Sequence, residues 1–429
     1  MDKSKKIFFY FLTIFFFFGP LLSATEVSKL RLSELLRLAQ ERNPGLLALQ
    51  QQVKAAQFRI LPQATLPDPF LSLNLKNISL SQFTVGKDMM SGVGFSVSQM
   101  IPFPGKLRLQ GEIAATQAKR TEVMLKASTW NLFRQIKELY FQLFYYQRAL
   151  EVLNKKRLFL AKAREAATIR YSVGGGAQND VFKAQLETSE VETMVKPMEQ
   201  MKQAVEGQLN ALLAFPVERP WGEAEGVPFY QLKTSLEELI AAAEQKSPQL
   251  EETRLLVEVR SKEVDLSRRE FWPNFMVQAG KEFKGPFKDM YEVMVGIEIP
   301  LYFKRKQANS LEAAVAELSE ARHSVVALQN ELNSMINENY LLAKSAEKLI
   351  QITRDTLLPQ ASLALESSLA NYQVGKVDFL SLLADIDSLY SYEMEYYRQL
   401  SDLWRAVSRL EELCGLNILN EEAESDRKK

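Results

Sequence analysis

The sequence predicts a mainly α-helical fold with a small antiparallel β part, arranged as two tandem structural repeats. Three observations support this prediction: a set of short motifs occurs twice in the same order, two long stretches follow a heptad pattern, and four short segments alternate apolar with polar residues. Heptad spacing is typical of long helices packed against other helices, and alternation is typical of half-buried strands. The 429 residues are therefore expected to form repeated units rather than unrelated domains.

Residues 1–24 have the composition of a secretory signal peptide. Three lysines among the first six residues precede an apolar run over residues 7–18. A run of this length is too short for a permanent membrane helix and suits a cleaved signal. We therefore expect an exported protein, with an uncleaved anchor as the alternative.

Composition argues against several classes of function. The 53 basic and 53 acidic residues give a net charge of zero, so no electrostatic signature of a nucleic-acid partner is present. The single cysteine, Cys414, excludes an intrachain disulfide framework and a Cys-rich zinc module. With one histidine, His323, few constellations for nucleophilic catalysis are possible. We expect no enzyme activity, no cofactor and no resident metal.

The internal repeat divides the chain. Three blocks recur in the same order: 32–39 with 236–243, 97–102 with 295–300, and 171–174 with 372–375. The offset is 204 residues between Leu32 and Leu236, and 198 residues between Val97 and Val295. The expected division is a first repeat over 25–215, a linker over 216–231, a second repeat over 232–415 and a polar C-terminal tail over 416–429.

Each repeat is expected to hold a short opening helix, a strand pair, a long helix, a tight turn and a second helix. The long helices are expected over 107–170 and 305–371, which carry the heptad pattern. At 1.5 Å per residue the first would extend roughly 95 Å. The second helices are expected over 180–214 and 378–413, with Pro197 as a possible kink.

The strand pairs are expected at 70–76 with 93–101, and at 274–283 with 291–299. One ordinary interpretation is a half-buried sheet in a soluble protein. Aromatic residues, however, gather at both ends of the strands, as they do at the two interfaces of a membrane barrel. Those at the helix end are Phe70, Phe103, Trp272, Tyr302 and Phe303, and those at the loop end are Phe83, Phe283, Phe287 and Tyr291.

Four strands cannot close a barrel, and an open edge in lipid leaves unpaired backbone groups that cost several kcal/mol each. Two copies would give 8 strands and a filled interior, whereas three copies would give 12 strands and a channel. We therefore expect a homotrimer. Glu282, Glu292 and Glu298 share the polar parity of their strands and would form acidic rings in the lumen that favour cations weakly, opposed by Lys76.

The two turn segments, RYSVGGGAQNDV over 170–181 and NYQVGKVDFL over 371–380, resemble the helix-turn tips of TolC-family outer membrane efflux proteins. The helix openings at 32 and 236 and the IPFPGK and IPLYFK junctions are similar to that family as well. The resemblance extends from about residue 30 to 415. It implies a trimer whose 12-stranded β-barrel, in outer membrane lipid, continues as a long α-helical barrel through the periplasm. It also implies docking to a periplasmic adaptor (membrane fusion) protein and to an inner-membrane pump of RND or ABC type.

The resemblance further implies roles for residues at the two tips. The residues that it places in contact with the adaptor are Val173, Gly174, Gly175, Val374, Gly375 and Lys376. Those that it makes candidates for closing the periplasmic aperture are Asp180, Asp378, Tyr372, Lys376 and Arg170. The alternative interpretation is that the glycines only form turns and that the charges are solvated helix ends.

The function expected from these observations is that of an outer membrane exit duct of a tripartite efflux system. It would passively export small solutes, metal ions or drugs, and the IPFPGK junction is more similar to the metal-efflux branch. One alternative is the outer membrane outlet of a type I protein secretion system. Another, from a different class, is a periplasmic coiled-coil scaffold whose strands form a soluble sheet.

Overall fold

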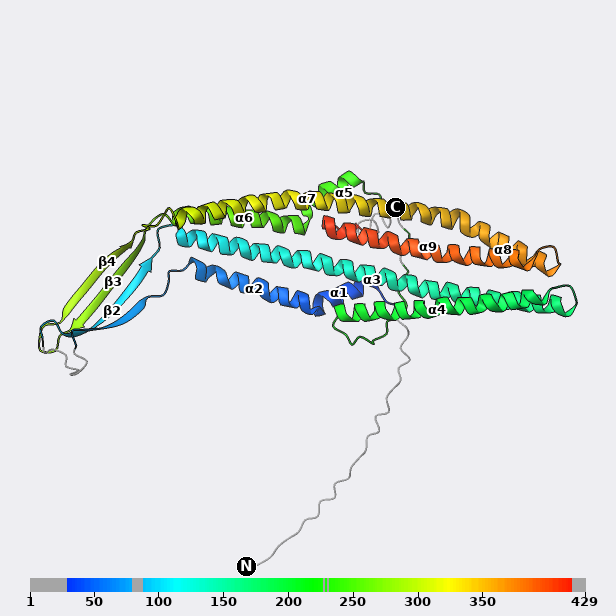
Figure 1. Ribbon diagram of the computed structural model, residues 1–429, viewed down its shortest axis with the longest axis horizontal. Coiled ribbons are helices and arrows are strands. Elements are labelled where there is room, and N and C mark those ends of the chain that lie inside the picture. The colour runs from blue at the N-terminus through cyan, green and yellow to red at the C-terminus, as the bar shows by residue number, and fades with distance from the viewer. Residues whose placement is uncertain (1–28, 79–87, 227, 230, 419–429) are drawn as a thin grey trace, which may run out of the picture.

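The computed structural model of the protein describes residues 29–78, 88–226, 228–229 and 231–418. Long helices run side by side along one axis, a small sheet extends from one end, and helix-to-helix turns form the other (Figure 1). The predicted fold class, mainly helical with a small antiparallel sheet, is confirmed. The signal peptide expected over 1–24 lies outside the described residues, as do Phe83 and most of the loop around it.

The described part of the first repeat contains four helices. They are α1 (Leu32–Arg42), α2 (Pro44–Ala64), α3 (Lys106–Ser172) and α4 (Gln178–Leu212). The side chain of Asn43 caps α2 by accepting a hydrogen bond of 3.0 Å from the Leu46 N–H, and Pro44 fills the first turn, where an N–H would have no helical partner. With 67 residues, α3 extends for roughly 100 Å. Pro197 lies inside α4.

The second repeat has helices in the same order. They are α5 (Leu236–Lys246), α6 (Pro248–Arg269), α7 (Gln307–Ile352), α8 (Leu358–Gln373) and α9 (Phe379–Cys414). A capping box starts α5, because Ser235 accepts from the Glu238 N–H while the Glu238 side chain accepts from the Ser235 N–H.

The long helix expected without interruption over 305–371 is divided, which corrects the sequence expectation. A π-helical segment, Thr353–Leu357, separates α7 from α8. Pro359 follows directly, in the first turn of α8. A proline lacks the N–H for a helical hydrogen bond, and its ring clashes with the carbonyl four residues earlier, here Asp355. The wider π turn gives that carbonyl room.

The sheet has four antiparallel strands in the order β1-β2-β3-β4. They are β1 (Phe70–Lys76), β2 (Gly92–Ile101), β3 (Asn274–Phe283) and β4 (Met290–Glu298). Each repeat supplies one hairpin, and β2 pairs with β3 to join them, with Val97 opposite Ala279. The edges of the sheet are therefore β1 from the first repeat and β4 from the second.

Among the described residues, two hydrophobic clusters hold the helices together, and each combines both repeats. The cluster at mid-length includes Ile136 of α3, Leu239 of α5 and Leu410 of α9. The cluster nearer the turns includes Leu160 of α3 and Leu382 of α9. The two repeats thus share one interior and fold against each other.

The predicted heptad seam is more deeply buried in α3 than in α7. Ile136 and Leu143 are completely buried in α3. In α7, Leu342 and Leu349 are exposed and line a groove whose opposite wall includes Arg405 of α9. The repeated spacing therefore predicts the helix correctly, but not which of its positions are covered within one chain.

Buried ion pairs connect α3 to α9 at mid-length. The Lys137 ammonium pairs with the Glu411 carboxylate, and both side chains are almost fully buried. Nearby, Arg134 Nε lies 2.8 Å from Glu412 Oε2, and Asn131 Nδ2 donates to Glu412 Oε1 at 2.8 Å. Because α3 and α9 belong to different repeats, this network fixes the position of one repeat against the other.

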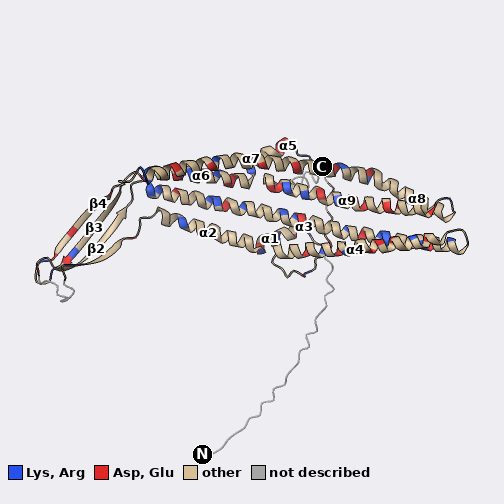
Figure 2. Ribbon diagram, viewed as in Figure 1, with Lys and Arg blue, Asp and Glu red and all other residues tan. Residues whose placement is uncertain are grey.

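Charges of both signs are interspersed along the helices (Figure 2). Among the described helices, none combines the length and the low polarity that a membrane-crossing helix requires.

Candidate functional site

The two helix-turn tips have matching backbone geometry. Gly174 after α3 and Gly375 after α8 have φ of 74° and 78°, values that L side chains rarely adopt. In the first tip the Gly175 N–H donates to the Arg170 carbonyl at 2.9 Å, and in the second the Lys376 N–H donates to the Asn371 carbonyl at 2.9 Å. These are helix-ending turns that need glycine. Both tips lie at the end of the molecule opposite the sheet (Figure 1).

Arg170 connects the two tips. Its Nη1 donates to the Tyr372 carbonyl oxygen at 2.8 Å, and its Nη2 donates to the Gly175 carbonyl oxygen at 2.7 Å. The guanidinium carbon also lies 4.6 Å from the centre of the Tyr372 ring, within range of a cation–π interaction. One side chain from the first repeat therefore holds the backbone of its own turn and that of the second repeat.

Tyr372 and Asp180 complete this contact between the tips. Tyr372 is completely buried, and its ring packs against Phe379 with centroids 5.2 Å apart. Its hydroxyl donates to Asp180 Oδ2 at 3.3 Å. Burial and the negative charge of Asp180 raise the pKa of Tyr372 to about 12, so the hydroxyl stays protonated as a donor. The structure thus brings Arg170, Tyr372 and Asp180 together.

The other two aperture candidates are placed differently. Asp378 is the N-cap of α9, and its carboxylate accepts from the Ser381 N–H at 2.8 Å and from the Ser381 hydroxyl at 3.2 Å. The bond from the backbone of Ser381 is the main reason that the pKa of Asp378 is lowered. Lys376 is exposed in the turn. Asp378 therefore has a structural task at the tip that Asp180 does not share.

The tips expose apolar side chains. Val173 is 76% exposed and Val374 is 68% exposed, each beside its turn glycine. Between the two turns lies an open depression of about 580 Å³ whose lining includes Gly174, Gly375 and Lys376. Each tip therefore exposes one valine beside its turn glycine, and the hollow between the turns is open.

At the other end of the molecule, the two faces of the sheet differ in polarity. Apolar side chains cover one face and are exposed in the single chain: Leu71, Leu73, Phe95, Val97, Val293, Val295 and Ile297. On the other face, Ser96 is buried, its hydroxyl lies 2.6 Å from that of Ser72, and it accepts from Asn74 Nδ2 at 3.3 Å. The polar side chains thus satisfy one another, while the apolar side chains face outward.

Lys76 pairs with carboxylates of two other strands on the polar face. Its Nζ lies 3.0 Å from Glu282 Oε2 on β3 and 3.9 Å from Glu292 Oε2 on β4, although β2 lies between β1 and β3. Gly92 on β2 allows this approach, because a Cβ there would come within 2.7 Å of Glu282 Oε1. Of the three expected luminal carboxylates, Glu282 and Glu292 share Lys76, and Glu298 accepts from Asn274 Nδ2 at 3.0 Å.

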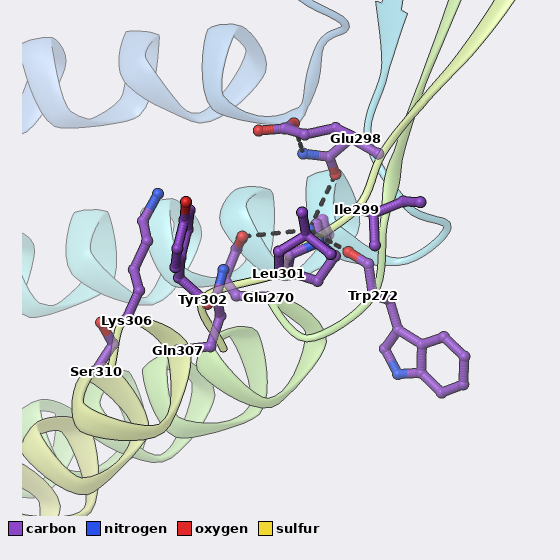
Figure 3. A pocket seen from close by; sticks show the side chains of 12 residues that line it. Glu270, Trp272, Glu298, Ile299, Leu301, Tyr302, Lys306, Gln307 and Ser310 are labelled. Atoms are coloured by element: carbon purple, nitrogen blue, oxygen red, sulfur yellow. Dashed lines mark hydrogen bonds and ion pairs between the residues drawn. The ribbon is translucent and has the colours of Figure 1, made fainter. Parts of the chain in front are cut away.

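Sequence reasoning missed the role of Lys106. Lys106 is only 3% exposed. Its ammonium donates to Asn274 Oδ1 at 2.9 Å, and to Glu270 Oε2 and the Trp272 carbonyl oxygen at 3.2 Å each (Figure 3). The Phe103 ring stacks on Trp272 with centroids 5.2 Å apart. Lys106 therefore joins the junction between β2 and α3 to the one between α6 and β3. The sequence carries one signal for this role, because a lysine ends both the IPFPGK and the IPLYFK junction.

Lys281 was missed as well. It has the parity of the apolar face, opposite Phe95 and Tyr291. Its Nζ lies 3.0 Å from Asp289 Oδ2 and 4.6 Å from the centre of the Phe283 ring. A lysine near the end of a strand can extend its charge to the membrane surface. Within the described residues, no three His, Cys, Asp or Glu side chains gather into a metal site.

The chain is similar in sequence to outer membrane efflux proteins. The family model of outer membrane efflux proteins matches residues 35–213 and 239–416. The cobalt-zinc-cadmium resistance protein CzcC of Cupriavidus metallidurans is 22% identical over 410 residues, which cover 92% of each protein. Outer membrane protein TolC of Vibrio cholerae is 22% identical over 432 residues, which cover 92% of this chain and 93% of TolC.

Solved structures share the fold. The outer membrane protein VceC of Vibrio cholerae superposes with a TM-score of 0.76 at 17% identity, over 90% of this chain and 96% of VceC. CusC superposes with a TM-score of 0.74 at 15% identity, over 88% of this chain and 91% of CusC. Because the family model matches both repeats and most of the sequence, the chain belongs to the outer membrane efflux protein family.

Proposed function

We propose that three copies of the chain assemble into the outer membrane exit duct of a tripartite efflux system. The observation that carries the proposal is the sheet, which has an exposed apolar face, a polar face and two edge strands within one chain. In lipid, the apolar face is favourable on the outside, and the edges must pair to satisfy their backbone groups. Three four-stranded sheets joined edge to edge form a barrel of 12 strands with a wet interior.

The helices would extend this duct below the membrane. Membership of the family makes the protein an outer membrane channel with a large periplasmic portion. At roughly 100 Å, α3 is long enough for that portion, and the tips lie at the end farthest from the sheet (Figure 1). Each tip, with its exposed valine and turn glycine, would contact a periplasmic adaptor. An inner-membrane pump of RND or ABC type would supply the energy.

The cargo proposed is a small solute, either a metal ion or a drug. The name of CzcC, a cobalt-zinc-cadmium resistance protein, favours metal ions. The acidic positions Glu282, Glu292 and Glu298 would give the lumen a weak cation preference, which a zero reversal potential in a salt gradient would contradict. The outlet of a type I protein secretion system is the second candidate. A periplasmic scaffold is disfavoured, because it would leave the apolar face of the sheet in water.

The proposal is tested by mild detergent extraction from outer membranes, followed by electrophoresis with and without heating. The expected result is a trimer that becomes a monomer only on heating, and ion conductance when the trimer is placed in a planar bilayer. A monomer after gentle extraction, or a trimer without conductance, would overturn the proposal.

The proposed gate at the periplasmic aperture has its own test. Asp180→Val removes the acceptor of the Tyr372 hydroxyl, and Asp378→Val removes the N-cap of α9. Both changes loosen the tips, so the double variant is expected to conduct several-fold more current per channel. Unchanged single-channel conductance would remove the gate assignment for these two residues.

A further inference from the structure

The edge strands of the sheet come from different repeats. β1 belongs to the first repeat and β4 to the second, while the central pair of β2 with β3 joins the repeats within one chain. In a closed ring of three copies, β4 of one copy must pair with β1 of the next. Around the ring, the pairing of β2 with β3 within a chain would then alternate with the pairing of β4 with β1 between chains. Each pairing would join a strand of the first hairpin to a strand of the second.

The internal repeat relates these two interfaces. A residue of β2 corresponds to the residue of β4 that lies 198 positions later, as Val97 does to Val295. A residue of β3 corresponds to the residue of β1 that lies 204 positions earlier, as Pro273 does to Pro69 just before the strands. The observed pairing of β2 with β3 is thus a template for the unseen pairing of β4 with β1.

We propose that β4 pairs with β1 of the partner subunit in the register that places Ile297 opposite the partner's Leu73. In the chain, Gln99 lies opposite Val277, and these two residues correspond to Ile297 and Leu73. The neighbouring pairs follow from the same template, with Val295 opposite the partner's Leu75 and Ile299 opposite the partner's Leu71. This inference rests on the proposed trimer and adds the residue contacts of its interface.

Side-chain parity supports this register. Val295 and Ile297 on β4, and Leu73 and Leu75 on β1, are all exposed in the single chain, and the register places all four on the same apolar face. A slip of one residue would put apolar side chains opposite polar ones. β1 also carries no carboxylate to oppose Glu298, which would lie across from the partner's Ser72.

A slip of two residues would preserve parity, and the helix junctions argue against it. In the chain, Ile101 pairs with Phe275, so Pro102 after β2 and Pro273 before β3 lie at the same height of the sheet. The proposed register gives Pro300 and the partner's Pro69 the same relation. A slip of two would displace one junction by roughly 7 Å along the strands, although the helices of all copies must leave the barrel at one level.

Cysteine cross-linking tests the register in the full-length protein. In a Cys414→Ala background, Ile297→Cys with Leu73→Cys is compared with two shifted controls, Ile297→Cys with Leu71→Cys and Ile297→Cys with Leu75→Cys. Residues directly opposite one another have Cα atoms about 4.5–5.5 Å apart, within the range of a disulfide. Residues displaced by two lie beyond roughly 7 Å and are unsuited. A second pair, Val295→Cys with Leu75→Cys, repeats the test where a first variant fails to fold.

After mild oxidation, heated samples are run on non-reducing gels. The two proposed pairs are expected to give a covalent trimer, and the controls are expected to give at least tenfold less of it. Efficient cross-linking of a shifted control, in a protein that forms heat-modifiable trimers, would overturn the register and leave the trimer intact. Heat-modifiable trimers in which no pair cross-links would overturn the pairing of β4 with β1. Monomers under reducing conditions, before any oxidation, would overturn the proposed trimer itself.

Discussion

At the scale of single residues, Arg170 contributes most to the arrangement of the tips. It donates to backbone carbonyls of both turns and lies over the Tyr372 ring. These partners are 202 and 5 residues away in the chain, so the side chain links the turn of the first repeat to the end of α8 in the second. Hydrogen bonds from a charged group are stronger than neutral ones.

Arg170→Ala is expected to loosen both turns, because two charge-assisted hydrogen bonds and one ring contact are lost. A cost of about 2 kcal/mol would accelerate amide exchange in the segments around Gly175 and Gly375 by roughly thirtyfold. Hydrogen–deuterium exchange with mass spectrometry measures this change. Arg164→Ala, an exposed arginine on the same helix, is the matched control and should exchange like the wild type. Equal protection in both variants would contradict the role of Arg170.

Cys414 is expected to be unreactive in the folded protein. It is completely buried, its thiol donates to the Leu239 carbonyl oxygen at 3.4 Å, and burial raises the pKa of the thiol to about 12. At pH 8 only about one thiol in ten thousand would be ionised, and the thiolate is the reactive form. Iodoacetamide should therefore label Cys414 only after unfolding, as detected by mass spectrometry. A Cys414→Ala protein with Val173→Cys at the exposed tip should be labelled rapidly without unfolding.

At the scale of elements, the contact between α3 and α9 depends on buried charges as well as on the hydrophobic clusters. Lys137 and Glu411 are enclosed by helices from both repeats. Removing one partner of such a pair leaves an uncompensated charge in the interior, whereas replacing both by apolar residues of similar size is often nearly neutral.

Lys137→Met alone is accordingly expected to destabilise the protein by about 3–5 kcal/mol. Lys137→Met with Glu411→Leu is expected to recover most of that loss. Thermal unfolding of the solubilised protein, followed by circular dichroism, provides the measurement. A double variant at least as destabilised as the single one would contradict the mutual compensation of the Lys137 and Glu411 charges.

The elements also show what sequence reasoning could and could not reach. Alternation and heptad spacing predicted the four strands and the long helices, because both patterns are local. The division of the second long helix at Thr353–Leu357 was missed, since heptad spacing does not show where one turn of a helix is widened. The resemblance named Arg170 and Tyr372 among the aperture candidates, but their direct contact could not be predicted, because the two residues lie on different hairpins. The exposure of Leu342 could not be predicted either, since heptad spacing does not show which apolar positions another helix of the same chain covers.

At the scale of the whole molecule, the protein places the four-stranded sheet at one end and the two helix-turn tips at the other (Figure 1). The buried Lys106 fixes the boundary between them, by joining the helix–strand junctions of both repeats. The sheet and the helical body are therefore held in a defined relation, as a continuous duct requires. Membership of the outer membrane efflux family agrees with that division.

The two faces of β4 offer a matched comparison for the whole assembly. Val295→Lys places a charge on the apolar face, which should cost about 2–4 kcal/mol per copy near the middle of the bilayer. Met294→Lys changes the adjacent residue, on the opposite face, and should be tolerated. Heat-modifiable trimers recovered from outer membranes are expected to be lost in the first variant and kept in the second. Equal recovery of both would contradict the assignment of the apolar face to lipid.

The π turn at Thr353–Leu357 gives the second repeat a mechanical joint that the first repeat lacks. On the first repeat, α3 passes without interruption to its tip, so a continuous long helix leads to one tip and an interrupted one to the other, although the tips have the same backbone geometry. A load applied at the tips by a docked partner would be taken up first by the hairpin of α8 and α9. In a ring of three copies, three hairpins with a continuous long helix would alternate with three that follow a π turn. The opening at the tips could then widen without bending α3.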